Sequence, residues 1–390
     1  MTRLATAWLV YRVTDSAFLL GAVTFAGQIP AFFIPPFAGV WLDRWDRHKV
    51  LIGCEALLML QSLAMAALAL SGSVNITWVF ALALVQGVVT AVEIPTRQSF
   101  IVRMIDDRAD LTNAIALNSS NFNAARLVGP ALAGGLVAAV GEGYCFLIDG
   151  LSYIAVIAGL LAMRLTKEAR PPSDRRVSQE LREGWQYLAG SAPIHTLLIF
   201  LGAVGVLGAP YSVLAPMIAR QMLGGGAHTL GFLMAASGAG ALVAAIGLVM
   251  RKSVLGLGRR MVVAVVAFGV GCIGLGLSTS LWVSLVLMAI TGYGLMTQIV
   301  GTNTMVQTLV EDDKRGRVMA FYTIALLGSS PIGSLLSGTL AARIGVEATL
   351  ALSGTTCTLT ALWFHRRLQT IRAAVRTRYA EIGIAASDAS

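Results

Sequence analysis

The eleven residues GVWLDRWDRHK, from Gly39 to Lys49, join two long apolar stretches near the start of the chain. Asp43 stands four positions after the glycine and is followed by three basic residues, Arg44, Arg47 and Lys49. The glycine allows two helices to approach closely, and the aspartate can face the positive end of a neighbouring helix dipole. A short charged segment between two such stretches predicts a loop at a membrane surface.

The composition also indicates a protein that lies in a membrane. The chain has 390 residues, of which 56% are hydrophobic and 13% are charged, about half the charged share of a soluble domain. Apolar stretches of about 20 residues, long enough to cross the hydrocarbon core, recur along the chain. We predict eleven complete spans, near residues 17–42, 49–71, 76–97, 112–139, 144–164, 193–219, 229–250, 260–279, 281–308, 318–342 and 346–364. Residues 1–11 resemble the end of a truncated first helix, and we expect its beginning to lie upstream of Met1.

The positions of lysine and arginine predict the orientation of the chain. Of the 29 Lys and Arg residues, 24 lie in alternate loops and in the tail, whereas the opposite loops hold three. The positive-inside rule places the side with 24 in the cytoplasm, together with the C-terminus. The net charge of +9 is spread over short loops, so it reports topology and we expect no nucleic-acid partner.

An internal duplication divides the chain into two pseudo-symmetric halves. Three glycines in the first half are separated by five and seven residues, and three glycines in the second half repeat both spacings: Gly129, Gly134, Gly141, Gly333, Gly338 and Gly345. Such a match predicts two bundles built from the same repeat. The helix-packing residues that we predict are Gly129, Pro130, Gly134, Gly333 and Gly338.

The repeat and the charge pattern predict four segments. They are a first transmembrane bundle at 1–165, a cytoplasmic linker at 166–191, a second transmembrane bundle at 192–364 and a basic cytoplasmic tail at 365–390. In the linker, apolar residues recur at helical spacing from Val177 to Leu188, which predicts an amphipathic helix. In the tail, Leu368, Ile371 and Val375 share one helical face among arginines, and we expect this helix to lie on anionic lipid.

The segment from Gly39 to Lys49 resembles the cytoplasmic signature of the major facilitator superfamily, G-x-x-x-D-R-x-x-R-[RK]. One position departs, because His48 stands where a basic residue is common and Lys49 follows it. The resemblance implies a conformational latch, and its residues here are Gly39, Asp43, Arg44, Arg47 and Lys49. The corresponding stretch of the second half has Arg251 in place of the acid, so we expect the latch on one side only. The alternative interpretation is a solvated basic loop.

Three further stretches resemble the exporter branch of this superfamily that includes the enterobactin exporter and macrolide-efflux proteins. They are AWLVYRVTDSAFLLG at 7–21, IPTRQSFI at 94–101 and LTNAIALNSSNFNAARLVGPALAGG at 111–135. The resemblance implies two six-helix bundles that export drugs or siderophores by proton antiport and alternating access. The antiporter signature of the fifth span is matched in part, with Ala125 in place of a glycine. The signature of the fourth span has Ala83 in place of an arginine.

Arg126 is the main candidate for the transport site. It lies near the middle of the span at 112–139, too deep to reach the membrane surface, and a charge at that depth is expected to face a cavity. Three nearby asparagines, Asn118, Asn121 and Asn123, add polar lining. The alternative is that Arg126 only pairs with another span and holds the fold.

Three acidic residues within the spans, Glu55, Glu93 and Asp149, are weaker candidates. Each lies four to six residues from the end of its predicted span, so each side chain can extend to the interface. A buried carboxyl group can carry the proton of an antiporter, and the second half has no acid between residues 183 and 311. We predict a proton carrier at Glu93 or Asp149, or a coupling role for the surroundings of Arg126.

Gln28 and Gln298 are polar residues on apolar spans, and they either line a central path or form hydrogen bonds between helices. The sequence has no metal-ligand spacing, nucleophile motif or phosphate loop, so we expect no enzyme, no metal and no cofactor beyond the proton gradient. We predict a monomeric inner-membrane exporter of a small amphiphile, with its cavity between the halves. Import of a small solute is the runner-up, and a channel is a weaker alternative.

Overall fold

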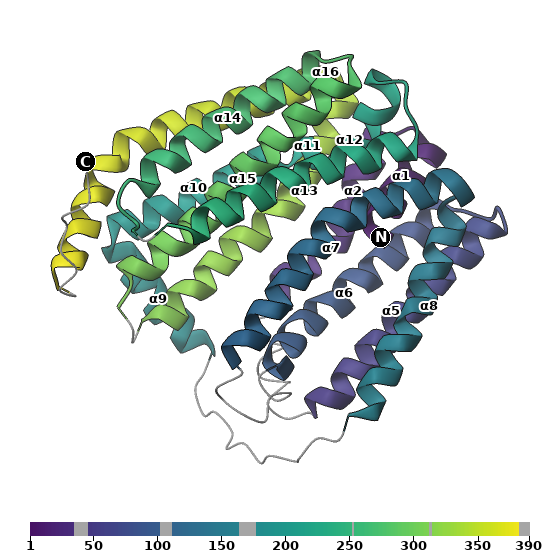
Figure 1. Ribbon diagram of the computed structural model, residues 1–390, viewed down its shortest axis with the longest axis horizontal. Coiled ribbons are helices and arrows are strands. Elements are labelled where there is room, and N and C mark those ends of the chain that lie inside the picture. The colour runs from purple at the N-terminus through teal and green to yellow at the C-terminus, as the bar shows by residue number, and fades with distance from the viewer. Residues whose placement is uncertain (35–45, 102–110, 164–176, 252, 312–313, 382–390) are drawn as a thin grey trace. The chain divides into compact units, whose positions relative to one another are not determined.

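The computed structural model describes residues 1–34, 46–101, 111–163, 177–251, 253–311 and 314–381. Over these ranges the chain forms helices and no strand, so the all-α prediction is confirmed (Figure 1). The first helices are α1 (Thr2–Thr14), α2 (Ala17–Gln28), α3 (Pro30–Phe33), α5 (Arg47–Leu70), α6 (Ile76–Ile101), α7 (Leu111–Val140) and α8 (Glu142–Ala162). They are followed by α9 (Val177–Gly190), α10 (Ala192–Gly208), α11 (Pro210–Val213), α12 (Ala215–Met217), the π-helical turn Ile218–Met222, α13 (Ala227–Val249), α14 (Leu257–Leu277), α15 (Leu281–Leu309) and α16 (Arg315–Glu381). Eight described helices are long and apolar enough to cross a membrane.

Local signals in the sequence set several of these helix ends. The α1 helix ends where Asp15 takes a left-handed conformation, with φ of 47°. The hydroxyl of Ser16 then accepts a hydrogen bond from the backbone N–H of Leu19 at 3.3 Å and begins α2. The carboxylate of Asp46 accepts one from the N–H of His48 at 3.0 Å and begins α5. Each cap satisfies a backbone donor that the first turn of a helix leaves free.

The duplicated glycines occupy the same backbone conformation in both halves. Gly141, which precedes α8, has φ of 87° and ψ of 168°, and Gly345, at the kink within α16, has φ of 83° and ψ of 167°. This region of φ is open to glycine and strained for other residues. The same turn therefore separates the fifth and sixth spans of each half, which agrees with a duplication.

The contacts group the chain into two compact units. The first unit contains Met1–Asp174 and Pro216–Ala235, and the second contains Arg175–Ala215 and Ala236–Ser390. The segment Pro216–Ala235, which includes the π-helical turn and the start of α13, therefore packs with the first unit. The boundaries predicted near 165, 191 and 364 follow the sequence repeat and remain a prediction.

Small residues allow the helices of the first unit to pack closely. The α5 and α8 helices lie side by side (Figure 1). A methyl group at Gly150 of α8 would lie 2.8 Å from Cδ2 of Leu63 of α5. A methyl group at Gly87 of α6 would lie 2.6 Å from the carbonyl oxygen of Gly27 of α2. The helices can lie this close because Gly150 and Gly87 carry no side chain at the crossing points.

Two of the predicted packing glycines of the first unit, Gly134 and Gly129, have different surroundings. A methyl group at Gly134 of α7 would lie 2.5 Å from Cα of Gly231 of α13, and one at Gly231 would lie 3.0 Å from the carbonyl oxygen of Pro130. The segment from Pro130 to Gly134 is therefore a close crossing. Among the described residues, none has an atom within 4 Å of the position that a methyl group at Gly129 would take, so its packing role stays a prediction. The motif spacing identified the helix but not which glycine faces a neighbour.

The second unit has an equivalent close approach. A methyl group at Gly333 of α16 would lie 2.6 Å from Cβ of Ala209, next to the end of α10. Gly338, one turn further, is buried. The segment predicted as a linker contains the helix α9, and the centroid of its Trp185 ring lies 6.0 Å from that of Phe321 in α16.

The tail differs from the prediction in its contacts, because the part of α16 that follows the kink at Gly345 continues to Glu381 and packs on the second unit. Leu368, Ile371 and Val375 are each at most 2% exposed, and Leu368 contacts Gly258 of α14. The apolar face of this segment thus packs within the second unit and does not lie on lipid. An amphipathic pattern fits a lipid surface and a protein surface equally well, which is why the sequence did not distinguish them.

Candidate functional site

A charge cluster lies inside the first unit where α5 packs against α6. Nη2 of Arg97 donates a hydrogen bond to Oε1 of Glu55 at 2.6 Å, and Nε of Arg97 donates one to Oε1 of Glu93, one turn earlier in α6. The two glutamates are 1% and 7% exposed, and the arginine side chain is 49% exposed. We refer to Glu55, Glu93 and Arg97 as the charge cluster.

The charge cluster adds partners that the sequence did not reveal. Glu55 and Glu93 each lie about eight residues, or roughly 12 Å, inside their helices and bond to Arg97, and their reach to the membrane interface stays a prediction. Arg97 lies within α6, which continues to Ile101, and its place on the cytoplasmic side also stays a prediction. The spacing of Glu93 and Arg97, four residues apart on one helix, is the signal that could have revealed the pair.

The charge cluster has an excess of acid. Two carboxylates around one guanidinium give a net charge of −1 when all three are ionised. Oε2 of Glu55 is buried and has no hydrogen-bond partner within the described ranges. A buried ionised oxygen without a partner costs free energy, which a bound proton would relieve. The arrangement can therefore hold one proton.

Asp149 lies in a separate polar group, in which its bonding partners are uncharged hydroxyls. Its Oδ2 accepts hydrogen bonds from the hydroxyls of Thr2 at 2.6 Å and Ser62 at 2.9 Å, which joins α8 to α1 and α5. Apolar side chains around Leu58, which lies between Glu55 and Ser62 on α5, make up a packed layer. Asp149 thus shares α5 with the charge cluster but has different partners.

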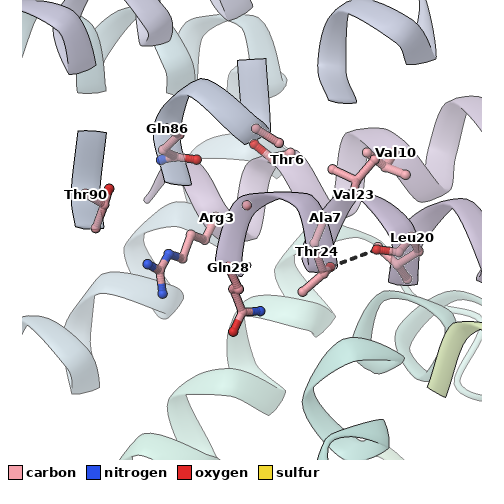
Figure 2. Close-up of a pocket in the computed structure, with 12 residues that line it drawn as sticks. Arg3, Thr6, Ala7, Val10, Leu20, Val23, Thr24, Gln28, Gln86 and Thr90 are labelled. Atoms are coloured by element: carbon pink, nitrogen blue, oxygen red, sulfur yellow. Dashed lines mark hydrogen bonds between the residues drawn. The ribbon is translucent and has the colours of Figure 1, made fainter. Parts of the chain in front are cut away.

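A pocket of about 80 Å³ lies in the first unit between α1, α2 and α6 (Figure 2). Its lining consists of Arg3, Thr6, Ala7, Val10, Leu20, Val23, Thr24, Gly27, Gln28, Ala83, Gln86 and Thr90. Gln28, for which a central path and hydrogen bonds between helices were both predicted, is in this lining. Arg3 is the one charged residue of the lining, and it is a site residue that the sequence analysis missed. An arginine within an apolar segment was the available signal.

The other predicted site residues have varied positions. Arg126, Asn118, Asn121 and Asn123 are on α7, and their side chains lie outside the described part of the structure. Gln298 of α15 is fully buried, so it does not face an open path, and neither atom of its amide group has a hydrogen-bond partner in the described ranges.

The latch residues are described only in part. Gly39, Asp43 and Arg44 lie outside the described residues. Arg47 is the first residue of α5, and Lys49 is exposed on its first turn.

His48, the residue that departs from the loop signature, joins three helices. Its Nε2–H donates a hydrogen bond to the carbonyl oxygen of Leu160 in α8 at 2.7 Å. The same ring stacks on Phe100 of α6, with centroids 5.7 Å apart and an interplanar angle of 11°. The ring thus ties the start of α5 to the ends of α6 and α8. In the second half, Arg251 instead donates to the carbonyl oxygen of Leu255 at 2.7 Å and closes its own loop.

The fold and these polar sites agree with what comparison with known proteins shows. A family model described as "Transmembrane secretion effector" matches residues 1–381. The chain belongs to this family, which is a branch of the major facilitator superfamily. It is therefore a multi-pass membrane protein that transports small molecules, and it is not an enzyme.

Curated relatives cover most of the chain. The staphyloferrin A transporter of Staphylococcus aureus is 25% identical over 92% of this chain and 90% of its own length. The multidrug efflux pump Tap of Mycolicibacterium fortuitum is 28% identical, over 90% and 88%. Macrolide efflux protein A of Streptococcus pyogenes is 22% identical, over 88% and 85%. The predicted exporter branch is confirmed.

Solved structures support the fold alone, because their sequences are distant. The nucleoside transporter NupG aligns with a TM-score of 0.70 over 94% of this chain and 97% of its own, at 15% identity. The POT family transporter PepTSo aligns with a TM-score of 0.72 over 95% and 96%, at 12% identity. The predicted major facilitator fold is confirmed.

Proposed function

We propose that the chain exports a small amphiphilic compound, of drug or siderophore type, across the inner membrane in exchange for protons. Family membership and the three exporting relatives support export, and they span a siderophore, several drugs and macrolides as cargo. In this proposal the protein acts as a monomer with its C-terminus in the cytoplasm. The exposed arginines of the last helix, and not its buried apolar face, contact anionic lipid.

The charge cluster is the observation that carries the proposal of proton antiport. It places two buried carboxylates and one guanidinium within spans, with one carboxylate oxygen left without a partner. Binding of a proton changes its net charge from −1 to 0 and weakens the hold of Glu55 on Arg97. A change of pairing between α5 and α6 is a local event that can bias one conformation over another.

The cluster couples to transport by alternating access. The two halves tilt about a shared cavity, and the protonated and ionised forms of the cluster favour opposite orientations. In this proposal Glu55 takes the role predicted for Glu93 or Asp149, because its second oxygen is buried and has no partner within the described ranges. Glu93 also bonds to Arg97, so its negative charge contributes to the net charge of the cluster.

The test uses everted membrane vesicles from a host that lacks its own efflux pumps. A panel of macrolides, other lipophilic drugs and siderophores is screened for saturable uptake driven by an acidic interior, with proton release followed by a pH-sensitive dye. We expect Glu55→Gln and Glu93→Gln to reduce coupled proton release at least tenfold. Glu347→Gln, at an exposed acid of the second unit, is the matched control and should behave as wild type.

The outcomes separate the competing functions. Wild-type proton coupling in both glutamine variants would refute the role of the charge cluster. Uptake only in right-side-out vesicles would establish import instead of export. Flux that does not saturate with substrate concentration would indicate a channel.

A further inference from the structure

Arg3 is a charged residue that has no counter-ion among the described residues. It extends from α1 into the pocket of the first unit, whose lining contains no carboxylate (Figure 2). Arg3 forms no hydrogen bond or ion pair with any residue that the structure describes. An arginine in an apolar part of a membrane protein is costly and normally has a partner or faces a path for substrate.

The depth of the pocket makes a partner necessary. Arg3 lies twelve residues before Asp15, the C-cap of α1, which corresponds to about 18 Å along the helix. Gln28 lies twelve residues after Ser16, the N-cap of α2, at the same depth. In a hydrocarbon core of about 30 Å this level is near the middle, and Arg3 is an exposed residue in the structure, so its guanidinium faces open space at that depth.

A second polar group faces the same pocket without a partner. The hydroxyl of Thr6, one turn after Arg3 on α1, is buried and has no hydrogen-bond partner within the described ranges, and its residue is 9% exposed. Residues three apart on a helix share a face, so the Arg3 guanidinium and the Thr6 hydroxyl are placed to contact the same ligand. Thr24 differs, because its hydroxyl donates to the carbonyl oxygen of Leu20 at 2.8 Å.

The walls of the pocket suit an amphiphile. Gln86 and Thr90 of α6 bring further polar groups, and Figure 2 shows Arg3 extending from α1 between Thr90 and Gln28. Apolar side chains of α1 and α2 complete the lining, among them Val10 and Val23. The pocket combines a cation, polar hydroxyl and amide groups and an apolar wall. The cation suits an anionic group of a bound compound, and the apolar wall suits a hydrophobic body.

We infer that this pocket binds the carboxylate of the exported compound, with Arg3 as its cationic partner and Thr6 as a second donor. The planar guanidinium presents parallel N–H groups that match the two oxygens of a carboxylate. The inference rests on the proposed export function and names the class of its cargo, an amphiphile that carries at least one carboxylate.

The test is a binding titration with two fluorescent probes of the same shape. Purified protein is titrated with dansylglycine, a carboxylate, and with dansylglycinamide, its neutral amide. We expect the wild type to bind the carboxylate about 10- to 100-fold more tightly, the factor typical of a hydrogen bond to a charged group. Arg3→Gln should remove this preference, and Arg3→Lys should retain most of it. Arg343→Gln, at an exposed arginine of the second unit, is the control.

A second variant tests the site without altering its charge. Thr6→Val keeps the size of the side chain and removes the hydroxyl, and we expect it to lower affinity for the carboxylate about fivefold and leave the amide unchanged. The inference is wrong if the wild type shows no preference for the carboxylate, or if the preference survives in Arg3→Gln.

The proposed function and this inference fail in different ways. If vesicles transport no compound but the binding preference follows Arg3, then the export proposal fails and the anion site stands. If wild-type vesicles export both charged and neutral compounds, and Arg3→Gln changes both equally, then export stands and the anion site is wrong.

Discussion

The charge cluster predicts a measurable coupling between Glu55 and Arg97. Glu55→Gln removes one charge and keeps the shape of the side chain. Arg97→Met removes the cation and leaves two buried acids facing each other. The double variant removes both charges, so one acid remains without a neighbour of the same sign. If the pair is held by its charges, the double variant should be more stable than the sum of the single effects predicts.

The structure sets the size of this effect. Loss of one member of a buried ion pair costs about 3–5 kcal/mol, and we expect about 2.5 kcal/mol for Arg97→Met because its side chain is half exposed. Glu55→Gln should cost about 1.5 kcal/mol, since a neutral acceptor still faces Nη2. The double variant should cost about 2.5 kcal/mol instead of about 4, which gives a coupling energy of about 1.5 kcal/mol.

The assay is reversible unfolding of the purified protein in mixed micelles, with a parallel measurement of transport. Arg97→Met combined with Glu347→Gln serves as the control, because these positions lie in different units and should be additive. A coupling energy below about 0.5 kcal/mol for Glu55 and Arg97 would refute the electrostatic interpretation of the cluster.

Two further predictions concern packing. Gly134→Ala should destabilise the protein by about 1–3 kcal/mol, because its methyl group would lie 2.5 Å from Cα of Gly231, whereas Gly129→Ala has open space and should be neutral or slightly stabilising. Thermal unfolding of both variants tests this, and equal effects would contradict the crossing. Leu368→Ala should lower the free energy of unfolding by about 2–4 kcal/mol, and Leu362→Ala, at an exposed position, by less than about 1 kcal/mol. A negligible effect of Leu368→Ala would instead support contact between the apolar face of the tail and lipid.

The sequence predicted the features that depend on order along the chain. The glycine spacings located the equivalent turns at Gly141 and Gly345, and charged residues at the ends of apolar stretches bounded α5 closely. The loop signature and the similarity to exporters gave the fold and the family, since both depend on residues that are near one another in sequence.

What the sequence did not predict depends on which helices are neighbours. Glu55 and Arg97 are 42 residues apart, and their pairing requires α5 to pack on α6 with α6 extended past the expected end of its span. The pocket at Arg3 requires three helices to enclose one space. The lipid contact predicted for the apolar face of the tail was wrong for a related reason. The periodicity of an amphipathic helix does not show which surface its apolar face contacts.

The part of α16 that follows Gly345 is long enough to convert a small rotation into a large displacement of its far end. From Gly345 to Glu381 it extends over about 36 residues, or roughly 54 Å, which exceeds the thickness of the hydrocarbon core. A rotation of about 10° at its origin would sweep the far end through roughly 9 Å. A spin label or fluorophore placed near Glu381 would therefore magnify small reorientations of the final span into distances that spectroscopy resolves well.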